Sequence, residues 1–132
     1  MDIVKFFLDV NYGDYSSRGA STLEMNILGD FLSSDVGFRG ETFKEWALAD
    51  KTDPNCRFGY SYGGNTTDLE EERGYIFFLD SISTHHIYTN LRMSRQQFIQ
   101  LLNEWQDMVC KLKPKEFAVK HENGQFIFIT NN

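Results

Sequence analysis

The hydrophobic and polar positions at the start of the chain predict a strand followed by a helix. Residues 3–10 are rich in β-branched and aromatic side chains, which is typical of a strand. Residues 11–19 then interrupt regular structure, because they are rich in Gly, Asn and Asp. Ser21 or Thr22 can cap a helix that runs to about Ser33. Apolar side chains at helical spacing mark its buried stripe: Leu23, Ile27, Leu28, Phe31 and Leu32.

The middle of the chain, Val36–Gly74, is less regular because glycines and a proline-containing turn interrupt it. The spacing of Phe43 and Trp46 suits a short helix over residues 41–49 as well as a twisted strand, so both stay open. Residues 58–62 alternate aromatic and small side chains, which indicates a strand or an extended loop.

Two further segments predict neighbouring strands. Tyr75–Leu79 is a continuous apolar run with the character of a central strand. His86–Asn90 follows it after a polar stretch, and we expect the two segments to pair in an antiparallel manner.

The clearest helix runs from Ser94 to Lys113. Ser94 and Gln97 have the spacing of a capping box, in which each side chain satisfies the other residue's free backbone N–H. Pro114 ends the helix because it has no N–H to donate. Seven apolar side chains fall on one face of this helix: Phe98, Leu101, Leu102, Trp105, Met108, Val109 and Leu112.

The C-terminal segment predicts a β-hairpin. Asn123–Gly124 lies between the alternating segments 116–120 and 125–129, and this dipeptide suits a two-residue turn in which both residues need a positive φ. The order of elements, with strands and helices interleaved and strands adjacent in pairs, predicts an α+β fold. We expect a single domain over residues 1–132, with an antiparallel β-sheet, two main helices packed on it and the C-terminal β-hairpin.

Composition supports one globular domain and narrows its partners. Hydrophobic residues make up 41% of the 132 residues, and 12 of them are Phe, which is enough for a core. The net charge is −6, and an acidic surface repels phosphates, so we expect no nucleic-acid partner. Residues 1–80 hold 15 acidic and 7 basic side chains, whereas residues 81–132 hold 4 and 6. The acidic excess therefore belongs to the first two-thirds of the chain and suits a basic partner.

The sequence predicts a cytoplasmic protein without a membrane segment. No apolar run approaches the roughly 18 residues that a membrane span needs, and the N-terminus lacks the features of a signal peptide. Cys56 and Cys110 are too few for a disulfide framework, although one disulfide between them stays open. We expect Cys110, beside the apolar stripe of the long helix, to be a buried structural thiol.

The densest charge run is Asp68, Glu70, Glu71 and Glu72. It suits a solvated loop that protects the following apolar strand from aggregation. It equally suits a docking surface, because carboxylates steer a positively charged partner and pair with its Lys and Arg. Aromatic anchors surrounded by charge are common at the centre of tight interfaces. We therefore take the four carboxylates together with two aromatic residues as candidate partner-binding residues, namely Tyr60 and Tyr62.

Candidate catalytic chemistry is sparse. His85 and His86 are adjacent, so on a strand they point to opposite faces and cannot easily bind one metal ion, and His121 would have to approach from the C-terminal hairpin. The chain has no nucleophile elbow, phosphate loop or dinucleotide fingerprint. We expect no enzyme activity, no metal and no cofactor.

Residues Met93–Trp105 and Lys113–Glu116 resemble small bacterial immunity proteins, of the kind that protect against contact-dependent growth-inhibition (CDI) toxins. The similar features are a Ser-capped helix with a Leu-Leu-x-x-Trp core and a Lys-Pro-Lys-Glu segment before a terminal hairpin, within about residues 75–130. The resemblance implies a cytoplasmic, non-catalytic protein that binds a toxin domain, often a basic nuclease. It lies in scaffold residues, so it carries over no binding residue.

The leading hypothesis is an immunity protein that neutralises a cognate secreted toxin domain, with an RNase favoured, by blocking its active site or substrate surface in a one-to-one complex. One alternative is a small metal-assisted hydrolase that uses His85, His86 or His121. Another is an adaptor or inhibitor of a different basic protein.

Overall fold

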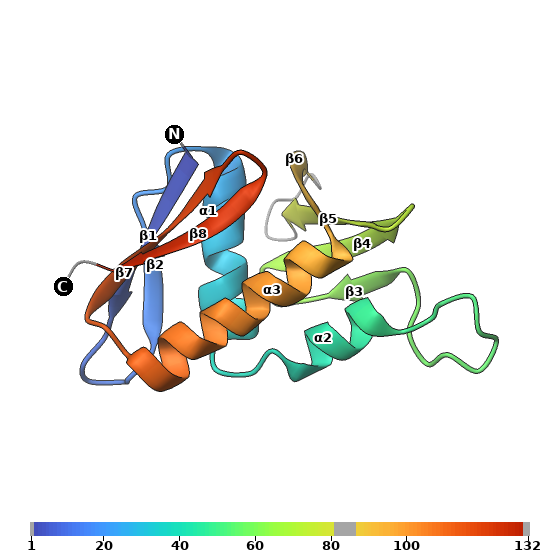
Figure 1. Ribbon diagram of the computed structural model, residues 1–132, viewed down its shortest axis with the longest axis horizontal. Helices are drawn as coiled ribbons and strands as arrows, with labels where there is room; N and C mark the ends of the chain where they lie inside the picture. The colour runs from blue at the N-terminus through green and yellow to red at the C-terminus, as the bar shows by residue number, and fades with distance from the viewer. Residues whose placement is uncertain (1, 81–86, 131–132) are drawn as a thin grey trace.

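The computed structural model, which describes residues 2–80 and 87–130, confirms the α+β class, the antiparallel pairing and the C-terminal hairpin (Figure 1). In this part of the chain the strands form two four-stranded antiparallel sheets, in the orders β2-β1-β7-β8 and β3-β4-β5-β6. The division into two sheets, and a third helix, are what the structure adds to the sequence prediction.

The first sheet joins the two ends of the chain. β1 (Asp2–Leu8) lies between β2 (Tyr15–Arg18) and β7 (Glu116–Glu122), and β8 (Gln125–Thr130) forms an outer edge. The prediction that residues 11–19 lack regular structure is wrong for β2. This strand forms because a turn closed by the Asp9 N–H and the Asp14 carbonyl returns the chain along β1.

The second sheet comes from the middle of the chain. Its strands are β3 (Ser61–Gly63), β4 (Thr67–Glu72), β5 (Tyr75–Asp80) and β6 (Ile87–Ser94). The antiparallel pairing of β5 with β6 confirms the sequence prediction. The acidic run is a strand rather than a loop, because every residue of β4 pairs with a residue of β5.

Three α-helices occur among the described residues. Thr22 caps α1 (Leu23–Asp30), which continues as the π-helical segment η1 (Phe31–Val36). The open segment at 41–49 is a helix, α2 (Glu41–Leu48). The long helix consists of α3 (Arg95–Gln106) and the π-helical segment η2 (Asp107–Leu112), and both hydrogen bonds of the predicted capping box are present.

One hydrophobic core lies between the two sheets and the helices. Both α1 and α3 contact strands of each sheet, and Figure 1 shows α3 extending across the two. Beside the first sheet, Trp105 of α3 packs edge-on against Phe6, with ring centroids 4.9 Å apart. Beside the second sheet, Phe31 packs edge-on against Phe78 at 5.1 Å. Residues from both sheets thus share one core, so the described chain forms a single domain.

The cysteines differ from the prediction. Cys110 is exposed, because it follows Val109 by one helical step and so faces away from the buried stripe. Cys56 is half-buried, and both cysteines are free thiols. None of the helices within residues 2–80 and 87–130 is long and apolar enough to cross a membrane.

Candidate functional site

Strand β4 divides the predicted acidic run between the two faces of its sheet. Successive side chains on a strand point to opposite faces. One set is buried against the core: Thr67, Leu69 and Glu71. The other set faces outward and is half-buried or exposed: Asp68, Glu70 and Glu72. Only these last three carboxylates are accessible to a partner.

The outward carboxylates lie beside an aromatic row on β5. The register places Glu72 opposite Tyr75 and Glu70 opposite Phe77. Tyr75 is 50% exposed and Phe77 is half-buried. Directly opposed residues in a sheet share a face, so carboxylates and aromatic rings form one mixed surface. We name this surface the acidic face and define it by Asp68, Glu70, Glu72, Tyr75 and Phe77.

The two tyrosines predicted as anchors lie elsewhere. Tyr62 is half-buried, and its ring centroid lies 5.3 Å from that of Phe43 and 5.9 Å from that of Trp46. Tyr60 is 53% exposed, but its backbone carbonyl accepts a hydrogen bond from the Glu71 N–H, which places it opposite an inward-facing residue. Neither tyrosine therefore joins the acidic face.

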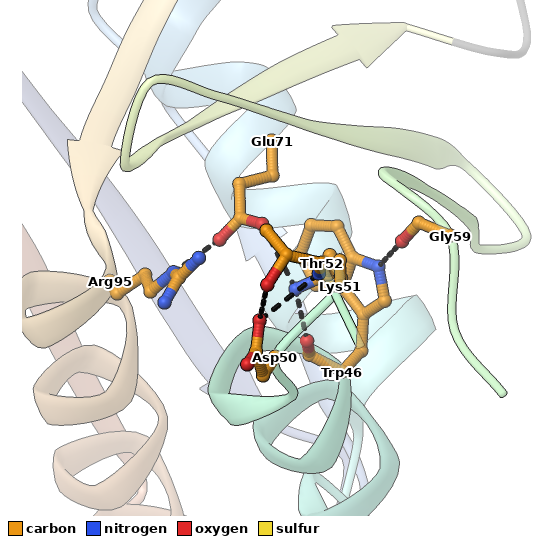
Figure 2. Close-up of polar contacts among 7 residues, drawn as sticks. All are labelled: Trp46, Asp50, Lys51, Thr52, Gly59, Glu71 and Arg95. Carbon is orange, nitrogen blue, oxygen red and sulfur yellow. Dashed lines mark hydrogen bonds and ion pairs between the residues drawn. The ribbon is translucent and has the colours of Figure 1, made fainter. Parts of the chain in front are cut away.

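Glu71 is a buried residue at the centre of an ion-pair network (Figure 2). Its carboxylate contacts the side chains of Lys51 and Arg95 from opposite sides. Lys51 Nζ lies 3.1 Å from Glu71 Oε2. The geometry of this contact does not fit a hydrogen bond, so the contact is an ion pair. The expectation that Glu71 faces a partner is wrong, because its side chain is only 2% exposed.

Lys51 reaches Glu71 from the segment after α2. Its ammonium group donates a hydrogen bond of 2.5 Å to the Trp46 carbonyl and lies 4.6 Å from the centre of the Trp46 ring. The indole N–H of Trp46 in turn donates to the Gly59 carbonyl at 2.9 Å (Figure 2). A buried ammonium group is costly unless it is paired. These contacts supply the pairing and fasten the loop after α2 to β4.

Arg95 connects the same network to the surface. Its side chain is 45% exposed, and its hydrogen bond to Glu71 raises the guanidinium pKa. Asp50 lies close enough to Arg95 to interact electrostatically, and hydrogen bonds from the Thr52 hydroxyl and N–H lower the Asp50 pKa. Every charge of the network is thus paired, which makes it a structural clamp between α2, α3 and β4 rather than a reactive site.

A half-buried carboxylate, Asp35 of η1, holds the turn between β3 and β4. It accepts hydrogen bonds from the Thr66 N–H at 2.9 Å, the Thr66 hydroxyl at 3.1 Å and the Thr67 N–H at 3.0 Å. Burial raises the pKa of Asp35, although these hydrogen bonds oppose the shift. The sequence gives no sign of this role, because Asp35 and Thr66 are far apart in the chain.

The histidines form no metal site in the part of the chain that is described. No three His, Cys, Asp or Glu side chains come together there in a way that could hold a metal ion. His121 stacks on Phe126, with ring centroids 4.5 Å apart, and its Nδ1 lies 3.9 Å from an Asp2 carboxylate oxygen. His85 and His86 lie outside the described residues.

The chain matches no protein-family model, no curated protein and no solved structure.

Proposed function

We propose that this chain is a cytoplasmic immunity protein, which binds a basic toxin domain through the acidic face and thereby blocks the active site or substrate surface of the toxin. A nuclease, and an RNase in particular, is the toxin we favour. The acidic face replaces the wider set of six residues that the sequence suggests, since Glu71 is buried and the two tyrosines lie apart from it.

One observation carries this proposal: the three outward carboxylates of β4 have no ion-pair partner among the described residues. Three unpaired carboxylates on one face of a strand repel one another, so they add no stability to the fold. A partner with Lys and Arg at matching positions supplies the missing counter-charges.

The aromatic row gives the same surface apolar area that a bound partner can desolvate. Tyr75 and Phe77 offer ring area next to the carboxylates, and Tyr is among the residues that contribute most at interface centres. A nuclease binds phosphates through a basic cleft, so carboxylates in a row can occupy the positions of successive phosphates. In this arrangement, the immunity protein and the nucleic acid compete for one surface.

The test is to mix the purified chain with the toxin domain encoded directly upstream of its gene. We expect a one-to-one complex at micromolar concentration, together with relief of toxicity when the two are produced in the same cell. The variant Glu70→Lys, Glu72→Lys is expected neither to form the complex nor to relieve toxicity at concentrations where the parent chain does both.

The matched control is Glu116→Lys, Glu122→Lys, which makes the same change in net charge on exposed residues of β7 in the other sheet. This control is expected to bind and protect like the parent chain. Failure of the parent chain to bind or protect overturns the proposal. Equal loss in both double variants overturns the assignment to the acidic face.

A further inference from the structure

Three of the four sheet edges carry features that discourage another strand from pairing with them. Short edge strands, charged side chains, glycines and bulges all have this effect. β2 has four residues and ends in Arg18, and β3 has three residues and includes Gly63. β6 carries the exposed Arg92, and its pairing with β5 shifts register between Phe77 and Leu79.

The fourth edge, β8, carries none of these features. Its six residues, Gln-Phe-Ile-Phe-Ile-Thr, include no charge, glycine or proline. Its register with β7 runs without interruption from Gln125 opposite Glu122 to Thr130 opposite Phe117. An edge that is uncharged, regular and apolar on both faces is a template for another strand.

The register identifies which backbone groups of β8 are free. Asn123 and Gly124 have φ values of 52° and 75°, so the hairpin turn is a two-residue turn with both φ angles positive. The residues that flank such a turn exchange hydrogen bonds, and bonded pairs then alternate with non-bonded pairs. The N–H and carbonyl groups of Phe126, Phe128 and Thr130 therefore point away from β7. No backbone hydrogen bond to these groups occurs within residues 2–80 and 87–130.

We propose that β8 pairs in an antiparallel manner with β8 of a second copy of this chain, so that the two first sheets become one continuous sheet across a two-fold axis. The axis passes beside Phe128, which lies opposite its own copy, and Phe126 lies opposite Thr130 of the other chain. This register satisfies the three free N–H and three free carbonyl groups of each strand with about six backbone hydrogen bonds.

The side chains of β8 favour a second copy as the occupant. In this register Ile127 of one copy lies opposite Ile129 of the other, and these residues are 39% and 37% exposed in the single chain. On the inner face, Phe128 already stacks on Phe117 at 6.2 Å, and the second Phe128 extends that stack. The strand is self-complementary and carries no charge, so no like charges lie opposite each other on the two paired strands.

This pairing does not depend on the proposed function. β8 belongs to the first sheet and the acidic face to the second, so each copy keeps its acidic face when two copies pair.

Two measurements on the intact chain test the proposal. Sedimentation equilibrium across the micromolar range is expected to show a mass that rises from 15.4 kDa toward twice that value. Residue-resolved amide exchange is expected to show that Phe126 and Phe128 become protected as concentration rises. Ile127 and Ile129 donate toward β7, so their protection should not change with concentration.

The variant Ile129→Lys places a positive charge on the edge and is expected to keep the chain monomeric at all these concentrations. Its control is Ile3→Lys, which adds the same charge on the same outer sheet face but on the inner strand β1, and is expected to associate like the parent. Circular dichroism establishes that both variants are folded.

A parent chain that stays monomeric throughout overturns the proposal, as does association that Ile3→Lys and Ile129→Lys weaken equally. Protection of Phe126 and Phe128 that arises only on addition of a toxin domain also overturns it, because the edge then receives a strand of a different protein. The first two results leave the binding of a toxin by the acidic face untouched, whereas the third would place a toxin contact on β8.

Discussion

At the scale of single residues, Lys51 and Glu71 depend on each other. Both side chains are at most 2% exposed, so neither charge can be solvated if the other is removed. We expect Glu71→Gln to lower the free energy of unfolding by about 3–5 kcal/mol, because it leaves a buried ammonium group without a counter-charge. Urea denaturation followed by tryptophan fluorescence measures this change.

Glu70→Gln is the control for this prediction, since it makes the same chemical change on the outward face of the same strand. We expect it to alter the free energy of unfolding by less than about 0.5 kcal/mol. The double variant Lys51→Met, Glu71→Leu is expected to recover much of the loss, because apolar side chains can replace a buried ion pair. A Glu71→Gln variant as stable as Glu70→Gln would contradict the role of the pair.

Asp35 gives the protein a pH-dependent stability of predictable sign. Burial raises its pKa in the folded chain, so the fold binds the Asp35 proton more tightly than the unfolded chain does. Its stabilisation is complete below the ordinary aspartate pKa of about 4 and is lost as the pH rises through the raised pKa. The difference in unfolding free energy between the parent chain and Asp35→Asn should therefore decrease with rising pH in this window.

The same shift can be measured directly. An NMR titration of the Asp35 carboxyl carbon is expected to give a midpoint above about 4. A midpoint at or below that value, or a stability difference that increases with pH, would show that the hydrogen bonds from Thr66 and Thr67 outweigh burial.

At the scale of elements, Gly29 sets the distance between α1 and the first sheet. A Cβ atom at this position would lie 2.8 Å from Val4 Cγ2 and 2.9 Å from Ser17 Cβ, closer than such atoms approach. Alanine favours a helix by about 1 kcal/mol relative to glycine, but overpacking a core costs about 1–3 kcal/mol. We expect Gly29→Ala to lower the melting temperature. Gly59→Ala, where a Cβ meets open space, should leave it unchanged.

Elements defined by local signals could be predicted from the sequence, and those defined by distant contacts could not. The long helix and the hairpin were predicted correctly, because their signals are local. These signals are the capping box of Ser94 and Gln97 and the two-residue turn Asn123–Gly124. The Gln97 side chain also donates to the Gly124 carbonyl across 27 positions, which no local pattern indicates. β2 was missed because its polar residues become a strand only through pairing with β1.

The candidate site shows the same limit. The composition of residues 68–72 indicates a concentration of negative charge, but it does not indicate which carboxylates face outward. That depends on whether the run forms a strand, and β4 forms only because β5 pairs along its whole length. Glu71 is accommodated in the core because Lys51 and Arg95 approach it from two helical regions, and the sequence contains no sign of that meeting.

At the scale of the whole molecule, the outer faces of the two sheets differ in their balance of charge. The first sheet is built from both ends of the chain. Its outer face carries three basic residues, Lys5, Arg18 and Lys120, and two acidic residues of β7, Glu116 and Glu122. The outer face of the second sheet carries the three carboxylates of β4 and one basic residue, Arg92 of β6, which lies opposite Phe77. The acidic face therefore holds only three of the 15 acidic residues in residues 1–80, and the others lie on the inner face of the same sheet or on other elements and loops.

This difference in charge between the two sheet faces predicts that the acidic face controls how fast a basic partner associates. We expect the variant Glu70→Lys, Glu72→Lys to lower the association rate constant for the toxin domain at least about tenfold at low salt. The difference in association rate constant between variant and parent should narrow at about 0.5 M salt, because screening there limits electrostatic attraction to a few ångströms. The control Glu116→Lys, Glu122→Lys carries the same net charge, so an equal slowing in both variants would mean that total charge steers the partner rather than the acidic face. Stopped-flow fluorescence across a salt series distinguishes these two outcomes.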